Sequence, residues 1–414
     1  MGTIKIPAAD VLKKIYGETE ESSARYTNLA VNFEKKYHHD KAEFFTAPGR
    51  TEIIGNHVDH NGGQIIAASI DLDTIGAAYP NGTNVIHMIS EGYRQEVVVD
   101  LDKLSTETYT KGTDALVAGI MEYMKKKGYA TGGFDAYVST KVIAAAGVSS
   151  SASFEMLVCA ITNYFFNEGK LEYGEYARAG QYAENVYWKK ASGLMDQMAS
   201  SVGNIITIDF ASPAKPVVEP VAVDFSKAGL ALCILDSGAD HADLTDEYAA
   251  IPAECRAVAA VCGGEVLRDV PFETFLAKLP ECRRQCGDRA VLRAFHIYAD
   301  NDRVAKQVAA LRDDDFDTFL RLVNESGRSS WEYLQNVIPA GYKEHQEVGV
   351  TIAAAKHLLG GKGAVRVHGG GFAGTVQAFV PVEMLAEFKA GMEAILGEGR
   401  CHVLSIRPEG GAVL

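Results

Sequence analysis

The apolar positions of the first half of the chain alternate between short continuous runs and segments with helical spacing. Short runs rich in β-branched and aromatic residues predict strands, and these runs cover 44–54, 64–79, 93–101 and 204–210. Apolar residues three and four positions apart predict helices, and this spacing covers 113–127, 152–166 and 172–190. Gly128 and Gly169 directly follow two of these segments, where glycine ends helices. The alternation predicts an α/β (α+β) protein.

A cluster of prolines near the middle of the chain predicts a domain boundary. The segment 212–216, with Pro220 just beyond it, would interrupt a helix or a central strand. Because 414 residues exceed one average domain, we predict a first domain over 1–214 and a second over 215–414. The second half opens with an apolar strand at 230–235, is then mainly helical, and closes with three strand-like segments: 363–368, 376–380 and 402–406. We expect the last of these to return to the first domain.

Composition narrows the class of protein. Hydrophobic residues make up 47% and charged residues 23%, with a formal net charge of −14, as in an ordinary globular protein with an acidic balance. No basic stripe is present, which argues against a nucleic-acid partner; Lys125–Lys127 reads as a solvated helix C-terminus. Without a signal segment or a run of about 18 apolar residues, we predict a cytoplasmic protein that is not bound to a membrane. The seven cysteines form no CxxC pair and are expected to be reduced thiols.

The first stretch with candidate chemistry is 49–63, where a predicted strand runs into a polar turn. Asn56, His57 and Asp59 could read several hydroxyl groups at fixed geometry, as a polyol ligand requires. Arg50 supplies a fixed positive charge suited to carboxylate or phosphate. Two other readings stay open: a merely polar turn, and a metal site built from His57, Asp59 and His60.

The second stretch is a small, serine-rich segment that leads into the apolar helix predicted over 152–166. Small residues at a helix N-terminus let backbone N–H groups approach an anion, and the helix dipole favours negative charge there. The candidate ATP-binding residues are Gly147, Val148, Ser149, Ser150, Ser151 and Ala152. A simple serine-rich helix cap is the other interpretation. No GxxxxGK[ST] segment occurs, so an ordinary P-loop is disfavoured.

The third stretch is the glycine-rich segment 368–374. It matches GxGxxG after a predicted strand, but only 40 residues follow, too few for the rest of a dinucleotide-binding domain. A loop that lies close to a ligand or to a neighbouring backbone explains it better.

In this order, the three stretches resemble the motifs of the GHMP kinase superfamily and, within it, of the galactokinase family. That family has a signature of the form GRxNxIGEHxDYNGG, a middle GLSSSAS and a late GGGFGG. The counterparts here are Gly49–Gly63, Gly147–Ser153 and Gly369–Gly374, and 193–197 resembles the family's G-[IL]-M-D-Q. The resemblance implies a two-domain GHMP kinase fold with the active site in the cleft between the domains. It also implies ATP and Mg²⁺ as co-substrate and cofactor, and a small-molecule sugar as acceptor.

The resemblance also implies roles for individual residues. Asp196 matches the carboxylate that accepts the proton of the sugar's anomeric hydroxyl, and Arg50 matches the arginine that keeps it ionised and steadies the phosphoryl group. Ser151 and Glu184 match magnesium ligands. The positions that match the sugar pocket are Asn56, His57, Asp59, Gly193 and Tyr248.

Two departures bear on the substrate. The family signature has Glu where this chain has Asn56, and Tyr where it has His60. In galactokinases that glutamate contacts the hydroxymethyl end of the sugar, so a neutral amide would remove repulsion against an anionic group there. Galactose remains the expected sugar, giving galactose 1-phosphate and ADP, with galacturonate, arabinose and N-acetylgalactosamine as alternatives.

Two further alternatives concern the class of protein. In the phosphate loop Ala145 and Ala146 stand where two glycines are usual, which raises the possibility of a non-catalytic sugar and ATP sensor. The presence of Asp196, Arg50 and Glu184 favours an active kinase. Another branch of the superfamily, acting on mevalonate, homoserine or an inositol-like alcohol, lacks the sugar signature seen here. We expect a monomer or a small homo-oligomer.

Overall fold

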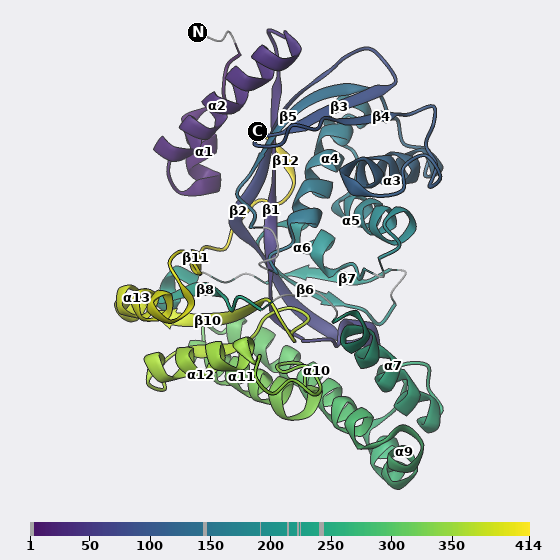
Figure 1. Cartoon of the computed structure of the whole chain (residues 1–414), viewed down its shortest axis with the longest axis vertical. Helices are drawn as coiled ribbons and strands as arrows, with labels where there is room; N and C mark the ends of the chain where they lie inside the picture. The colour runs from purple at the N-terminus through teal and green to yellow at the C-terminus, as the bar shows by residue number, and fades with distance from the viewer. Residues whose placement is uncertain are drawn as a thin grey trace.

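The computed structural model describes residues 4–143, 147–190, 192–212, 215–221, 223, 225–239 and 244–414 (Figure 1). Ala145 and Ala146 of the predicted phosphate loop lie outside these ranges, as does Ala214 at the predicted domain boundary.

The upper half of the molecule in Figure 1 is built on an eight-stranded sheet. Six of its strands follow the order β12-β1-β2-β5-β3-β4; β6 also pairs with β2, and β7 pairs with β6. Neighbouring strands are antiparallel apart from the β3–β5 pair. The strands are β1 (Glu43–Ile54), β2 (Gln64–Pro80), β3 (Val85–Ser90), β4 (Val97–Asp100), β5 (Phe134–Thr140), β6 (Ile205–Asp209), β7 (Val217–Pro220) and β12 (Ala412–Val413).

Helices cover both faces of this sheet. The helices α1 and α2 lie on one side, and α3, α4 and α5 lie on the other (Figure 1). Apolar side chains of α3 and α4 pack against those of β3, β4 and β5 in one core, so the all-round apolar character of α4 reflects its complete burial. These helices are α1 (Ala9–Tyr16), α2 (Glu20–Tyr37), α3 (Gly112–Lys126), α4 (Ser150–Asn167), α5 (Tyr173–Tyr182) and α6 (Met195–Val202).

The lower half holds a four-stranded antiparallel sheet in the order β11-β8-β10-β9, packed with helices (Figure 1). Its strands are β8 (Leu230–Asp236), β9 (Ala364–Val367), β10 (Thr375–Pro381) and β11 (Cys401–Leu404). The helices of this half are α7 (Thr245–Cys262), α8 (Phe272–Ala277), α9 (Leu279–Cys286), α10 (Asp288–Arg312), α11 (Phe316–Ser329), α12 (Glu347–Leu359) and α13 (Leu385–Leu396).

The strands and helices predicted from hydrophobic spacing are confirmed to within a few residues, and the second half is mainly helical as predicted. The segment predicted over 172–190 is an α-helix only to Tyr182 and continues as a π-helical turn, Ala183–Tyr187. The domain boundary stays a prediction; β7, which follows it in sequence, pairs with β6 of the upper sheet.

The end of the chain joins both halves. Strand β11 pairs with β8 in the lower sheet, whereas Ile406 bridges Ile70 and β12 pairs with β1 in the upper sheet. Between them, Arg407 donates a 2.7 Å hydrogen bond to Asp73 of β2. Asp73 is fully buried and also accepts hydrogen bonds from Arg25 of α2 and from two hydroxyls, so a buried polar cluster fixes the C-terminal segment to the first sheet.

Candidate active site

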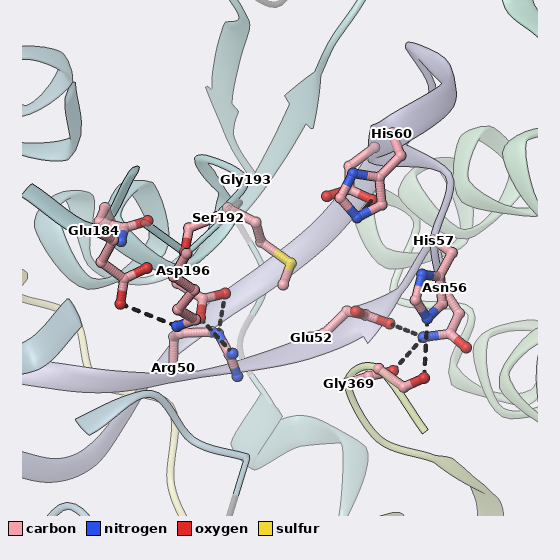
Figure 2. Close-up of a pocket in the computed structure, with 15 residues that line it drawn as sticks. Arg50, Glu52, Asn56, His57, His60, Glu184, Ser192, Gly193, Asp196 and Gly369 are labelled. Carbon is pink, nitrogen blue, oxygen red and sulfur yellow. Dashed lines mark hydrogen bonds and ion pairs between the residues drawn. The ribbon is translucent and has the colours of Figure 1, made fainter. Parts of the chain in front are cut away.

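Strand β1 places two charged side chains on one face of the sheet. Arg50 and Glu52 are two residues apart, so they point the same way from the strand. The pairing of β1 with β2 shifts register between Pro48 and Arg50 and again between Glu52 and Ile54. Irregular pairing of this kind re-aims side chains and often occurs beside active sites. The strand thus presents Arg50 and Glu52 together toward one cavity (Figure 2).

Arg50 binds Asp196, a residue of the first turn of α6, through both ends of its guanidinium group. Its Nε donates to Oδ1 at 2.8 Å and its Nη2 to Oδ2 at 2.7 Å (Figure 2). This bidentate geometry fixes the carboxylate plane as well as its distance. The structure therefore brings these two residues, which are distant in sequence, into direct contact; their joint role stays a prediction.

The segment before α4 is attached to the same pair. Ser149, the N-cap of α4, has φ +61° and donates its hydroxyl to Asp196 Oδ2 at 2.8 Å. Arg50 donates from Nη1 to the carbonyl of Gly147, and its backbone N–H donates to the carbonyl of Val148 at 3.0 Å. A Cβ on Gly49 would lie 2.7 Å from that same Val148 oxygen, so this close approach of strand and loop requires glycine.

These contacts set the charge of Asp196. Burial acts to raise its pKa, but the charge and hydrogen bonds of Arg50, with the hydrogen bond from Ser149, outweigh burial and hold the pKa below its ordinary value. The carboxylate is therefore ionised at neutral pH. Its side chain is 31% exposed, so it can be reached from the cavity.

A cavity of about 290 Å³ lies above Arg50 and Asp196, close to the lower end of the range typical for small-ligand sites. Of the predicted site residues, it brings together Arg50, Asn56, His57, Asp59, Glu184, Gly193 and Asp196. Glu184 lies at one end of the cavity, and Asn56 and His57 lie at the other (Figure 2). The remaining predicted residues are not among those that line it.

The glycine-rich segment 368–374 closes the end of the cavity near His57. His57 Nε2 donates to the carbonyl of Gly370 at 2.9 Å, and burial and the neighbouring His60 lower the pKa of His57 to about 4. Tyr248 of α7 contacts this segment from its other side, donating its hydroxyl to the carbonyl of Gly371 at 2.8 Å. Tyr248 thus supports the glycine segment and does not line the cavity.

Comparison with known proteins agrees with this geometry. Residues 32–80 match the galactokinase galactose-binding signature, and residues 115–204 match the GHMP kinases N-terminal domain. The fold matches the Lactococcus lactis galactokinase, solved in complex with galactose, with a TM-score of 0.76, 24% identity and 98% coverage of both chains. The chain therefore has the GHMP kinase fold and carries a match to the galactokinase galactose-binding signature.

Other kinases share this fold. A mevalonate kinase matches with a TM-score of 0.62 and 14% identity, covering 88% of this chain and 99% of that one. A D-glycero-D-manno-heptose 1-phosphate kinase from Bacteriodes thetaiotaomicron matches with a TM-score of 0.57 and 14% identity, covering 90% and 98%. The two-domain GHMP kinase fold predicted from the motifs is confirmed.

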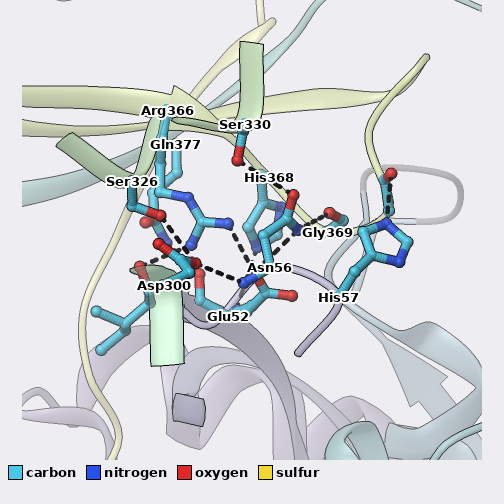
Figure 3. Close-up of polar contacts among 12 residues, drawn as sticks. Glu52, Asn56, His57, Asp300, Ser326, Ser330, Arg366, His368, Gly369 and Gln377 are labelled. Atoms are coloured by element: carbon cyan, nitrogen blue, oxygen red, sulfur yellow. Dashed lines mark hydrogen bonds and ion pairs between the residues drawn. The ribbon is translucent and has the colours of Figure 1, made fainter. Parts of the chain in front are cut away.

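The cavity has one lining residue, Glu52, that the motif comparison overlooked. Glu52 stands where the family signature has Asn, just as Asn56 stands where the signature has Glu. Burial raises the pKa of Glu52, and the Arg366 guanidinium opposes that effect by donating to Oε1 at 2.6 Å (Figure 3). The signal was present in the sequence, because the two letters are exchanged within one motif.

A second cavity, about 700 Å³, adjoins the N-terminus of α4. Ser150, Ser151 and Phe154 of that helix line it together with aromatic residues from other elements: Tyr93, Tyr109 and Trp188. These aromatic residues carry no motif, so sequence spacing alone did not reveal them. Gly147, Val148 and Ser149 lie in the loop before α4 and Ala152 lies in the first turn of that helix, but none of the four lines this cavity.

The residues predicted to ligate magnesium are adjacent. Ser151 donates its hydroxyl to Glu184 Oε1 at 2.8 Å, and the side chain of Lys190 contacts the same oxygen at 3.1 Å. Glu184 is buried on the π-helical turn that interrupts its helix, a feature often found at functional sites. A hydroxyl and a carboxylate oxygen are the hard ligands that Mg²⁺ prefers, so these residues fit that ion.

Within the described ranges, no group of three or more His, Cys, Asp or Glu side chains is arranged to hold a metal ion. The alternative metal site of His57, Asp59 and His60 is therefore not assembled. In the same part of the chain, no helix has both the length and the apolar character needed to cross a membrane.

Proposed function

We propose that this protein is an ATP-dependent sugar kinase that transfers the γ-phosphoryl group to the anomeric hydroxyl of galactose. The observation that carries the proposal is the Arg50–Asp196 pair, which joins the floor of the sugar-sized cavity to the loop before α4. A carboxylate held ionised beside a cation and next to a helix N-terminus suits proton abstraction during phosphoryl transfer.

In the proposed reaction, Asp196 accepts the proton of the C1 hydroxyl. The C1 oxygen forms a bond to the γ-phosphorus, the bond from that phosphorus to the β–γ bridging oxygen breaks, and ADP leaves with the electron pair. Arg50 holds Asp196 in the acceptor geometry and offsets negative charge on the transferring phosphoryl group. Ser149 fixes the carboxylate through Oδ2, leaving Oδ1 as the oxygen with more room to accept the proton.

ATP would lie with its phosphates at the N-terminus of α4 and its base in the second, aromatic-lined cavity. Mg²⁺ would be held by Ser151 and Glu184 and would neutralise phosphate charge. Lys190, which contacts Glu184, lines the sugar cavity as well and supplies a second cation near the phosphates. All seven cysteines are unpaired, which supports the proposed cytoplasmic location.

The experiment that tests the proposal is a labelled-ATP transfer assay with a sugar panel of galactose, galacturonate, arabinose and N-acetylgalactosamine. The expected result is a galactose product whose phosphorus NMR signal couples to the C1 proton. Asp196→Asn should lose at least about a hundredfold in kcat, the lower range for removal of a general base. Asp317→Asn, an exposed carboxylate in the first turn of α11, is the matched control. Equal, negligible transfer by wild type and Asp196→Asn across the panel would favour the non-catalytic sensor.

A further inference from the structure

Asn56 borders the sugar cavity, yet its side-chain amide is fully engaged by the protein. Its Nδ2 donates to the carbonyl of Gly369 at 2.5 Å and to Glu52 Oε1 at 3.2 Å. Its Oδ1 accepts from Asn336 at 2.6 Å and from Ser330 at 3.4 Å (Figure 3). An amide has two N–H donors and two acceptor lone pairs, so nothing on Asn56 remains for a ligand.

Glu52 has the opposite situation. Its Oε1 accepts from Arg366 and Asn56, whereas Oε2 has no hydrogen-bond partner among the residues that the structure describes. The side chain lines the cavity between the Arg50–Asp196 pair and His57 (Figure 2). One oxygen thus anchors the carboxylate while the other remains available to hydroxyl donors.

The anchor of Glu52 is built to hold a carboxylate. Arg366 of β9 is fully buried, and it donates both to Glu52 and, through Nη1, to the carbonyl of Ile53 at 2.8 Å. The backbone N–H of Glu52 donates to His368 Nε2 at 3.3 Å. Contacts to the side chain and to the backbone on either side fix the direction in which Oε2 points.

The charges that line the cavity also favour a sugar without an anionic group. Its lining has two cationic side chains, Arg50 and Lys190, against four carboxylates. The carboxylates are Glu52, Asp59, Glu184 and Asp196. Both cations lie at the Asp196–Glu184 end, where each contacts a carboxylate. The opposite end has no cation among its lining residues to receive an anionic substituent.

We propose that Glu52, not Asn56, is the carboxylate that reads the hydroxyls of the sugar, and that it makes this site select a neutral aldose over the corresponding sugar acid. This inference rests on the proposed sugar-kinase function and reverses the expectation that Asn56 opens the pocket to a uronic acid. The exchange of the two residues within one motif moves the carboxylate by four positions in sequence and keeps its charge in the cavity. A carboxylate placed to accept hydrogen bonds from sugar hydroxyls repels an analogue that carries a carboxylate of its own, so the site selects against the sugar acid.

The test compares kcat/KM for galactose and galacturonate in wild type and Glu52→Gln. We expect wild type to prefer galactose by at least tenfold. In Glu52→Gln, kcat/KM for galactose should fall at least tenfold, mainly through KM, and the preference over galacturonate should fall at least tenfold. A purely structural role as the partner of Arg366 would not change that ratio.

Glu254→Gln is the matched control, because Glu254 is the carboxylate partner of another buried arginine, Arg293, at 2.8 Å and lies away from the cavity. The preference of Glu254→Gln for galactose over galacturonate should stay within twofold of that of wild type. A folded Glu52→Gln whose ratio matches wild type overturns the inference, and so does a wild type that prefers galacturonate, although the sugar-kinase proposal survives both results.

Glu52→Asp covers the case in which the Gln variant does not fold. It keeps the charge but withdraws the oxygens, so KM for galactose should rise at least tenfold while galacturonate stays rejected; an unchanged KM overturns the inference. If wild type phosphorylates no sugar, the proposed function fails. The role of Glu52 is then tested by calorimetry, which compares galactose binding by wild type and by Glu52→Gln. At least tenfold weaker binding by the variant supports the role of Glu52, whereas equal binding, or none by wild type, overturns it.

Discussion

Arg50 and Asp196 are 146 residues apart in sequence, yet two parallel hydrogen bonds of 2.8 and 2.7 Å join their side chains. One comes from a strand and the other from the first turn of a helix, so the pair fixes β1 relative to α6. A lysine cannot reproduce the planar two-point contact. Replacing Arg50 by lysine should therefore disturb the position of Asp196 even though the positive charge is kept.

Arg50→Lys should therefore lower kcat by about 10²–10³-fold, the range for loss of a preorganised charge contact in a transition state. KM for the sugar should change much less. Steady-state rates with Mg-ATP measure this. Arg312→Lys, at an exposed ion pair with Glu219, is the control and should match wild type. A lysine variant with near-normal kcat would show that charge alone suffices.

Ser149→Gly isolates the hydroxyl that contacts Asp196. Glycine accepts the positive φ of this position without strain, so the variant removes only the 2.8 Å hydrogen bond. A hydrogen bond to a charged group contributes about 1.5–3 kcal/mol, and we expect kcat to fall by about 10–100-fold. If kcat is unchanged, the hydroxyl does not position the carboxylate.

The lowered pKa of Asp196 predicts a pH-dependent contribution to stability. Such a group stabilises the folded state above its unfolded pKa of about 3.9, and that contribution is lost as the pH falls through the lower, folded pKa. The unfolding free energy of wild type minus that of Asp196→Asn should be constant from pH 8 to pH 5 and shrink below about pH 4. Urea titrations across this range measure it, with Asp317→Asn as a variant that should show a smaller trend. A gap that widens on acidification contradicts the prediction.

The buried cluster around Asp73 predicts a large stability effect from the C-terminal segment. Arg407→Met removes a fully buried partner at 2.7 Å and leaves Asp73 with less compensation for its charge. Breaking such a pair costs about 3–5 kcal/mol, measured by urea unfolding. Arg400→Met, at a half-exposed pair with Asp236, should cost less than about 1 kcal/mol. Similar losses in both variants would show that burial does not set the effect.

Much of the fold and part of the site could be predicted from the sequence because their signals are local. The strand at 43–54 and the buried helix at 150–167 follow from short-range hydrophobic spacing. The Arg50–Asp196 pairing followed from motifs and not from spacing, since contacts at long range leave no local pattern. Arg366 and Asp73 show the limit: each is a charged residue in an apolar strand, and only the folded structure shows the partner that permits its burial.

The pocket residues illustrate a second limit. A motif comparison marked Asn56 as the changed sugar contact, although its amide is used up by Gly369, Glu52, Asn336 and Ser330. Whether a polar side chain faces a ligand depends on which of its hydrogen bonds the protein already satisfies. Three of these four partners, Ser330, Asn336 and Gly369, lie more than 270 residues away in sequence, so the motif alone could not show them.

Glu155 of α4 offers the opposite pH dependence from Asp196. It is fully buried, its Oε2 accepts from Gln197 at 3.1 Å, and Oε1 has no partner within the described part of the chain. Burial and the nearby charge of Glu184 raise its pKa well above the ordinary value. A raised carboxyl pKa means that folding becomes less favourable as the pH rises above the unfolded value of about 4.3.

Glu155→Gln should therefore gain stability over wild type as the pH rises from 4.5 to 8, with a slope of at most about 1.4 kcal/mol per pH unit. The two proteins should differ least at pH 4.5, where the wild-type carboxyl is protonated in the folded state and still about 40% protonated in the unfolded state. Urea unfolding at each pH measures the gap, and Glu398→Gln, at an exposed position, should show a much weaker trend. A gap independent of pH would mean that Glu155 is ionised in the folded protein, and that Gln197 and its surroundings stabilise a third carboxylate beside Glu184 and Asp196.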